Sequence, residues 1–232
     1  MEVLLGVFNV AWEDKLSLCT LAFQFNNLNM KIGSLFLALF LCMAIYAQHD
    51  EAYVDQLAEG FSQNLKERGI TNYFTTKRYC SGKIEMFQIE GKMCTSKGTY
   101  YEVYVVWQEE GKDFIKKIDN CGLFFTETLD NTTLYDFYQK EYPALIDDEV
   151  KPYRSTAFTG KPQLRKEVQP CFREFSFVKG SRVDDKKFNL FALSNESDGK
   201  NENYTFNQTL KLVALNKKMD TLLNSLNFKR QN

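Results

Sequence analysis

The sequence is almost without histidine, since His49 is the only one among 232 residues. Serine–histidine and cysteine–histidine sites need an imidazole beside the nucleophile, and hydrolytic zinc sites usually need histidine ligands. The sequence also lacks phosphate-binding loops, dinucleotide fingerprints, nucleophile elbows and calcium-binding loops. We therefore predict no histidine-dependent catalysis, no cofactor and no metal, and we favour a protein that is not an enzyme.

An excess of charge of one sign is lacking as well, because 29 Lys and Arg stand against 30 Asp and Glu. A protein that binds nucleic acid or an anionic membrane surface needs a positive field. The balanced composition therefore predicts no nucleic-acid partner. We interpret short charged runs, such as Asp-Asp-Lys-Lys at 184–187, as solvated turns.

The third absence is a long hydrophobic run. The longest, residues 32–44, has about 13 residues, whereas a transmembrane helix needs about 20 and the core of a signal peptide about 7–15. A methionine and a lysine precede this run, and a polar stretch follows Ala47. The layout predicts a signal peptide over residues 30–47, cleaved after Ala47, and no stable membrane span after cleavage. The alternatives are a buried core helix and lipidation at Cys42, which lacks the small preceding residue of a lipoprotein signal.

Residues 1–29 do not fit the start of a signal peptide. They contain two apolar patches separated by Glu13-Asp14-Lys15, and acidic residues directly upstream of a signal are unusual. We interpret residues 1–29 as a non-native upstream extension, with translation starting at Met30; the alternative is a disordered leader. Residues 48–232 then form a single secreted or periplasmic domain. This domain has no net charge, because the removed part holds two lysines and three acidic residues.

Cleavage also removes two of the six cysteines and leaves an even number, which in an exported protein favours disulfides. Of the three pairings that four cysteines allow, we favour Cys80–Cys94 with Cys121–Cys171. A zinc site is one alternative, but no two of these cysteines are only two to four residues apart. A reactive Cys121 thiol is another, which an oxidising compartment disfavours.

Four Asn-x-Ser/Thr motifs are glycosylation acceptors if the source is eukaryotic. They are Asn131, Asn195, Asn203 and Asn207. In that case we expect all of them to lie in surface loops. In a bacterial source, which the sequence leaves open, the motifs would carry no such meaning.

Three helices are predicted from apolar residues at spacings of three and four. The first begins after Asp50 and ends near Arg68. A short middle helix begins near Asp130 and is expected to break at Pro143. The last covers about residues 207–227, and its narrow apolar seam is expected to pack on the sheet rather than on a second copy. The protein is therefore predicted to be a monomer.

Residues 73–129 are predicted to be rich in strands, separated by turns that contain glycine. The best-defined hairpin pairs residues 100–108 with 113–119 around Glu110-Gly111. In this register one face of the hairpin is apolar. Lys116 interrupts that face, and we expect its amine to reach solvent at a sheet edge.

Two further strands are predicted at residues 172–178 and 188–193, after a long polar surface loop at 147–170. The order helix, strands, helix, strands, helix predicts a single α+β domain. We expect a mainly antiparallel sheet of about five to seven strands, with the N-terminal, middle and C-terminal helices packed on one side.

Carboxylate pairs are the remaining route to catalysis, because two Asp or Glu residues can hydrolyse a glycoside without histidine. In the predicted hairpin Glu102 lies opposite Asp119, and like charges across strands are unfavourable and can raise one pKa. This pair is our candidate acidic site, with Ca²⁺ binding or simple solvation at a sheet edge as alternatives. Glu85 and Glu174 are other acids on or beside predicted strands.

The sequence thus favours an exported, non-catalytic protein that binds an unknown protein or glycan partner or belongs to the cell envelope. The alternative is a secreted carboxylate-based hydrolase that acts on glycans. A concave pocket with two buried carboxylates would favour the enzyme. An exposed apolar patch or a bare sheet edge would favour the binding protein.

Overall fold

The computed structural model describes residues 49–130, 133–155, 157, 160–195 and 199–231. Contacts divide the chain into two units, residues 1–48 and 49–232, and only the second is described here. The predicted signal peptide, its cleavage site and our interpretation of residues 1–29 therefore lie outside the described residues.

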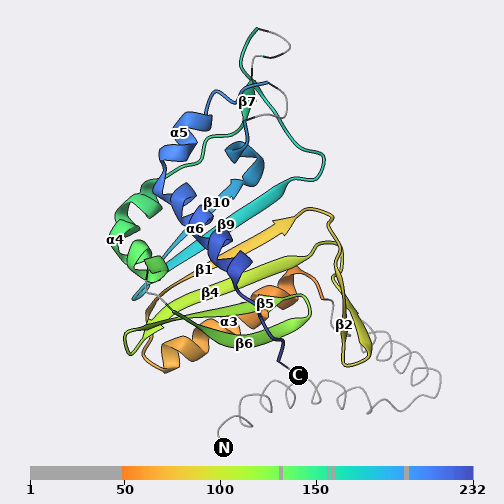
Figure 1. Cartoon of the computed structure of the whole chain (residues 1–232), viewed down its shortest axis with the longest axis vertical. Helices are drawn as coiled ribbons and strands as arrows, with labels where there is room; N and C mark the ends of the chain where they lie inside the picture. The colour runs from red at the N-terminus through yellow and green to blue at the C-terminus, as the bar shows by residue number, and fades with distance from the viewer. Residues whose placement is uncertain (1–48, 131–132, 156, 158–159, 196–198, 232) are drawn as a thin grey trace, which may run out of the picture. The chain divides into compact units, whose positions relative to one another are not determined.

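The domain is built on one antiparallel sheet of six strands in the order β10-β9-β1-β4-β5-β6 (Figure 1). Two small two-stranded sheets, β2–β3 and β7–β8, accompany it. The predicted α+β class is confirmed. The helices are α3 (Glu51–Glu67), α4 (Thr133–Asp147), the 3₁₀ helix η3 (Leu190–Leu193), α5 (Tyr204–Thr209) and α6 (Lys211–Ser225). The strands are β1 (Asn72–Cys80), β2 (Met86–Ile89), β3 (Lys92–Thr95), β4 (Tyr101–Glu109), β5 (Lys112–Asp119), β6 (Gly122–Leu129), β7 (Arg154–Ser155), β8 (Gln163–Leu164), β9 (Cys171–Lys179) and β10 (Arg182–Asn189).

Helix α3 packs on one face of the sheet, over β4, β5 and β6. As predicted, Asp50 caps the helix by accepting a hydrogen bond from the Tyr53 amide at 3.1 Å. The helix buries Val54 and Leu65 against a cluster that includes Trp107. This layer is the apolar face that the sequence pattern predicts.

Helices α4 and α6 pack on the opposite face, so the expectation of helices on one side only is wrong. The reason lies in the central strands, where successive side chains such as Tyr73 and Phe74 are both apolar and point to opposite faces. Phe74 and Phe177 pack there with Tyr138 and Leu212. Each face of β1 and β4 therefore needs its own covering helix.

The β4–β5 hairpin has the predicted register, with Trp107 opposite Phe114 and Glu102 opposite Asp119. The expectation for Lys116 is wrong, because β6 extends the sheet and makes β5 an interior strand. Lys116 is 3% exposed and lies beneath α3, its amine 5.5 Å from the centre of the Phe61 ring. Burial lowers the pKa of this amine.

Helix α4 continues through Pro143, where a break was expected. Proline removes one backbone hydrogen bond and crowds the preceding turn, at a cost of about 3 kcal/mol. Buried side chains on both sides of it, Tyr142 and Leu145, belong to the core cluster that α4 shares with α6 and the sheet. Tertiary packing therefore holds the helix together past the proline.

The strand expected at residues 188–193 begins earlier, at Arg182, and ends at Asn189. The apolar run that follows it, Leu190–Leu193, forms η3 instead. The pattern misleads because β10 is an edge strand with charged residues on both faces, so it lacks apolar alternation.

The last predicted helix is two helices, because the backbone of Leu210 is extended between α5 and α6. The side chain of Asp148 caps the first turn of α6, since its Oδ2 accepts a hydrogen bond from the Leu212 amide at 2.8 Å. The predicted seam of α6 packs on the core cluster of the sheet through Leu212, Leu215 and Met219.

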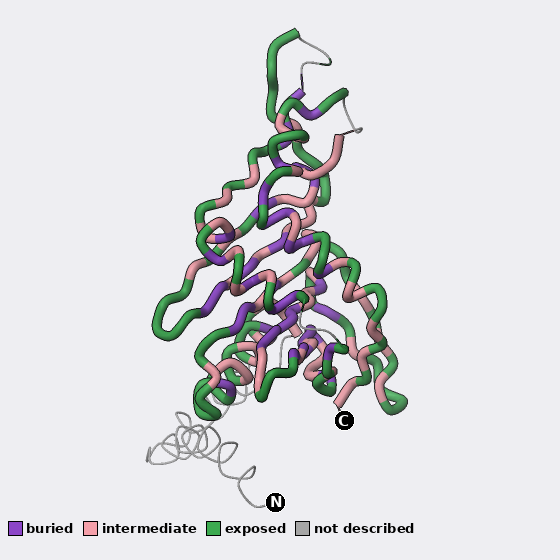
Figure 2. Tube along the Cα trace, turned by 60° about the vertical axis from the view of Figure 1, so that its left-hand side comes forward, coloured by how far each residue is buried: buried purple, intermediate pink, exposed green. Residues whose placement is uncertain are grey.

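The loop predicted at 147–170 is mostly irregular but carries the β7–β8 pair, near the top of Figure 1. Tyr153 anchors it, since the ring is 1% exposed and stacks on Phe191 with centroids 4.5 Å apart. Figure 2 shows buried residues along the central strands and exposed residues along this loop.

The C-terminal segment runs beside β6. The Phe125 amide donates to the Lys229 oxygen at 2.7 Å, and the Gln231 amide donates to the Leu123 oxygen at 2.8 Å. Phe228 packs against the rings of Tyr104 and Phe124. This edge of the sheet is therefore covered, whereas β10 forms the other edge.

The disulfides join Cys80 to Cys171 and Cys94 to Cys121, so the pairing favoured from the sequence is wrong. Cys80 and Cys171 lie directly opposite each other because β1 pairs with β9, which is distant in the sequence. Cys94 lies in the β2–β3 arm, whose base is tied to the turn between β5 and β6. Pairing cysteines that are consecutive in the sequence fails because neighbouring strands of the sheet are not consecutive in the chain.

Candidate functional site

A groove lies on the α3 face of the sheet, between α3 and the strands that α3 leaves uncovered. Helix α3 lies over β4–β6, and on this face β1, β9 and β10 carry half-buried or exposed side chains except for the buried pair Tyr73 and Val178 at one end. The groove has a volume of about 430 Å³. Its walls come from α3 and its floor from the strands; the lining residues are Asp55, Ala58, Thr75, Lys77, Val103, Glu174, Phe175, Ser176, Asp185, Lys186 and Lys187.

Lys77 is the centre of the groove's polar network. Its amine lies 2.7 Å from Glu51 Oε1, 2.9 Å from Asp55 Oδ1 and 3.8 Å from Glu174 Oε2. Glu51 and Asp55 are one helical turn apart on α3, so both carboxylates face β1. Glu174 is the residue directly opposite Lys77 on β9. Sequence spacing and strand register together therefore place three carboxylates around one ammonium.

These contacts shift the pKa values of both partners. Burial of Lys77 lowers its pKa, but the hydrogen bonds and charges of the carboxylates outweigh burial and the net pKa is raised. Burial of Glu51 raises its pKa, but Lys77 and a hydrogen bond from the Tyr101 hydroxyl, at 3.1 Å, outweigh burial and the net pKa is lowered. Both groups are therefore held in their charged forms.

A second cation extends the network towards β10. The Lys187 amine lies 2.7 Å from Glu174 Oε1 and donates to the Tyr79 hydroxyl, also at 2.7 Å. These contacts with Glu174 and Tyr79 raise the pKa of Lys187. The row Lys77–Glu174–Lys187 thus crosses three neighbouring strands with alternating charge.

Aromatic rings form the next row, towards the Cys80–Cys171 disulfide. The Tyr79 ring lies 4.9 Å from Tyr101 and 5.4 Å from Phe172, measured between centroids. Lys77 and Lys187 lie over these rings. The open face therefore combines fixed charges with half-buried aromatic surface.

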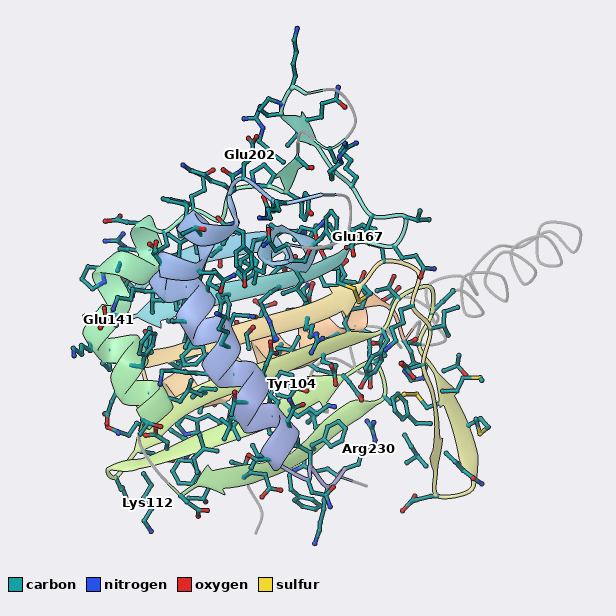
Figure 3. All side chains as sticks on the ribbon, turned by 45° about the horizontal axis from the view of Figure 1, so that its top comes forward. Tyr104, Lys112, Glu141, Glu167, Glu202 and Arg230 are labelled. Atoms are coloured by element: carbon teal, nitrogen blue, oxygen red, sulfur yellow. A yellow bond between two sulfur atoms is a disulfide. The ribbon has the colours of Figure 1, made fainter. Side chains whose placement is uncertain are left out.

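The predicted acidic pair, Glu102 and Asp119, lies on the other face of the sheet, away from this groove. Each acid has its own cation: Lys117 lies 2.7 Å from Glu102, and Arg230 binds both oxygens of Asp119 at 2.7 and 2.8 Å. The Tyr100 hydroxyl also donates to Asp119, and burial followed by this negative charge raises the pKa of Tyr100. Arg230 is labelled in Figure 3.

Two other candidate acids are also placed by the structure. Glu174 lies in the groove, so this prediction from the strand pattern found one member of the network. Glu85 lies at the base of the β2–β3 arm and pairs with Lys83 at 2.7 Å. The other charged members, Lys77, Lys187, Glu51 and Asp55, were missed, although the lysines lie inside otherwise strand-like segments.

His49 is hydrogen-bonded to the turn between β5 and β6. Its Nδ1 donates to the Asn120 oxygen at 2.7 Å, and its own backbone oxygen accepts from Asn120 Nδ2 at 2.6 Å. Its ring meets Tyr53 edge to face. The neighbouring Cys121 is disulfide-bonded and is not a free thiol.

Of the four glycosylation motifs, Asn131 is outside the described residues. Asn207 contradicts the surface expectation, because it is fully buried and its Nδ2 donates to the Lys151 and Ala192 oxygens. Asn203 Nδ2 donates to the Pro152 oxygen in an exposed contact, and Asn195 is half-buried.

Within the described ranges, no three His, Cys, Asp or Glu residues are grouped as metal ligands would be, and none of the helices has the length and apolarity to cross a membrane. Comparisons with protein-family models, curated proteins and solved structures found no match.

Proposed function

We propose that residues 48–232 are exported and bind a neutral, hydroxyl-rich ligand, such as an oligosaccharide, in the groove between α3 and β10. The observation that carries this proposal is a groove of about 430 Å³ whose charged walls already compensate one another. Small-molecule sites typically have volumes of about 300–1,000 Å³. The two disulfides are compatible with an extracellular location.

The charges of the groove favour a neutral ligand. Lys77, whose side chain is 13% exposed, is hydrogen-bonded to Glu51 and Asp55, so a charged ligand would have to break a partly buried ion pair. A hydroxyl group, by contrast, can donate to a carboxylate and accept from an ammonium without displacing either. Fixed charges that cancel therefore offer strong hydrogen bonds without a net attraction for ions.

The aromatic row favours a ligand with an apolar face, as a sugar ring has. Tyr79 and Phe172 are half-buried and lie beside the charged row. Lys187 covers both rings, but its side chain is 55% exposed, so its amine can move aside at small cost. A ring that stacks on Tyr79 would then reach Glu174 with its hydroxyls.

The same geometry speaks against a carboxylate-based hydrolase at this site. A general acid needs a raised pKa, whereas the pKa of Glu51 in the groove is lowered. Glu102 and Asp119 are bound to cations on the other face of the sheet. We therefore prefer binding to catalysis.

The test is binding of residues 48–232, with disulfides intact, to a panel of immobilised neutral oligosaccharides. Ser176 lies on the groove floor, so Ser176→Phe should fill the groove without removing a charge and weaken binding at least tenfold. Thr128→Phe, at an exposed position on β6, is the matched control and should bind like the wild type.

Three outcomes would contradict the proposal: no oligosaccharide binds, Ser176→Phe binds as well as the control, or the bound oligosaccharide is cleaved. The last result would favour the hydrolase. Export is tested separately, by N-terminal sequencing of the secreted or periplasmic product. A mature start at Gln48 is expected, and a peptide from residues 1–29 would refute the assignment of the signal.

A further inference from the structure

Two buried polar atoms without a hydrogen-bond partner lie on the α6 face of the sheet, opposite the groove. Arg173 is fully buried; its Nε donates to Asn216 Oδ1 at 2.8 Å and its Nη2 to Asp220, but its Nη1 has no partner. Thr76 is also fully buried, and its hydroxyl has no partner.

The strand register makes Thr76 and Arg173 neighbours on this face of the sheet. Thr76 pairs with Phe175 and Arg78 pairs with Arg173, so Thr76 and Arg173 are diagonal neighbours on β1 and β9. Side chains at such diagonal positions, on the same face of a sheet, are within reach when one of them is long. A group placed between them could accept from both.

The charges around Arg173 are not balanced. Arg78 on β1 is directly opposite Arg173 on β9, and Asp220 forms an ion pair with both arginines. Glu102, whose negative charge also acts on Arg173, is already bound by Lys117 at 2.7 Å. Among the charged groups described around this position, three cations therefore face two carboxylates.

We infer that Arg173 Nη1 and the Thr76 hydroxyl form an internal site for a small inorganic anion of the chloride class, beneath α6. An anion would accept both orphaned hydrogen bonds and neutralise the excess positive charge, whereas a water molecule would do only the first. The side chains of Asp220 and Arg78 are 37% and 46% exposed, so the site has a short route to solvent. The inference is independent of the proposed groove function.

The first test uses bromide as the probe. Crystals of the oxidised domain grown in sodium bromide should show an anomalous peak within about 3.5 Å of Arg173 Nη1. A water molecule there, or no anomalous peak, would overturn the inference.

The second test measures affinity in solution. The wild-type melting temperature should rise with sodium chloride at constant ionic strength, and the rise should saturate as the site fills. Thr76→Val keeps the side-chain shape and removes the hydroxyl, so it should weaken chloride binding about fivefold. Thr128→Val, exposed on β6, is the control and should leave the chloride dependence unchanged. Equal chloride dependence in wild type and Thr76→Val would refute the site.

Discussion

The ion pair between Arg230 and Asp119 ties the last residues of the chain to the sheet, and it gives a quantitative prediction. Asp119 is fully buried and the Arg230 side chain is 14% exposed. Removing one partner of a buried pair usually costs about 3–5 kcal/mol, because the other charge is left uncompensated. Asp119 would keep hydrogen bonds from the Tyr100 hydroxyl and the Cys121 amide. We therefore expect Arg230→Met to cost about 3 kcal/mol.

The reverse substitution should cost less. In Asp119→Asn the orphaned guanidinium lies near the chain end and can turn towards water, so we expect about 2 kcal/mol. The double variant should lose about 1.5 kcal/mol less than the sum of the two single costs, and this difference is the coupling energy between the two side chains. Urea unfolding of the oxidised domain measures all three values. Arg182→Met, which breaks an exposed ion pair with Asp184, is the control and should leave the stability unchanged within the error of the measurement.

Additivity of the two single changes to within about 0.5 kcal/mol would refute this reasoning. It would mean that the tail and the buried carboxylate are stabilised independently. A control that costs as much as Arg230→Met would refute it in a different way, because burial would then not decide the energy.

Two further predictions concern the groove network and the buried glycosylation motif. Because the pKa of Glu51 is lowered, its contribution to folding stability is present above about pH 4.5 and is lost as the pH falls through the pKa of the folded state. Because the pKa of Lys77 is raised, its contribution is present below about pH 10.5 and is lost as the pH rises through the pKa of the folded state. Lys77→Met should therefore cost about 1 kcal/mol between about pH 5 and 10 and clearly less below about pH 4, measured by urea unfolding across pH; a pH-independent cost would contradict the network. Asn207→Ala should cost about 3 kcal/mol by losing hydrogen bonds to residues 151 and 192, and Asn203→Ala under about 1 kcal/mol, as thermal unfolding would show; equal costs would contradict the burial of Asn207.

Local patterns predicted the parts of the fold that form within a short stretch of chain. The cap at Asp50 and the turn at Glu110-Gly111 have side-chain or backbone chemistry that acts over a few residues. The alternation of β4 then fixes its register with β5, residue by residue. These elements formed as predicted because nothing distant competes with them.

Features that depend on distant pairing could not be predicted in this way. The groove exists because β1 pairs with β9, which brings Lys77 beside Glu174. The same pairing decides the disulfide between Cys80 and Cys171. Strand β10 was placed too late in the chain because its face towards the groove carries Asp185 and Lys187, and Lys187 meets Glu174 only in the assembled sheet. The charged residues of the groove therefore remove the apolar alternation from which β10 could have been predicted.

The turn between β5 and β6 holds both ends of the described chain at adjacent residues. Asn120 binds His49, and Asp119 binds Arg230. Seen mechanically, a force applied between the two ends would load these few hydrogen bonds and the short path through residues 119 and 120. It would not first load the ladders of β1, β9 and β10. The contacts of His49 and Arg230 would therefore break before the strands that form the floor of the groove are separated.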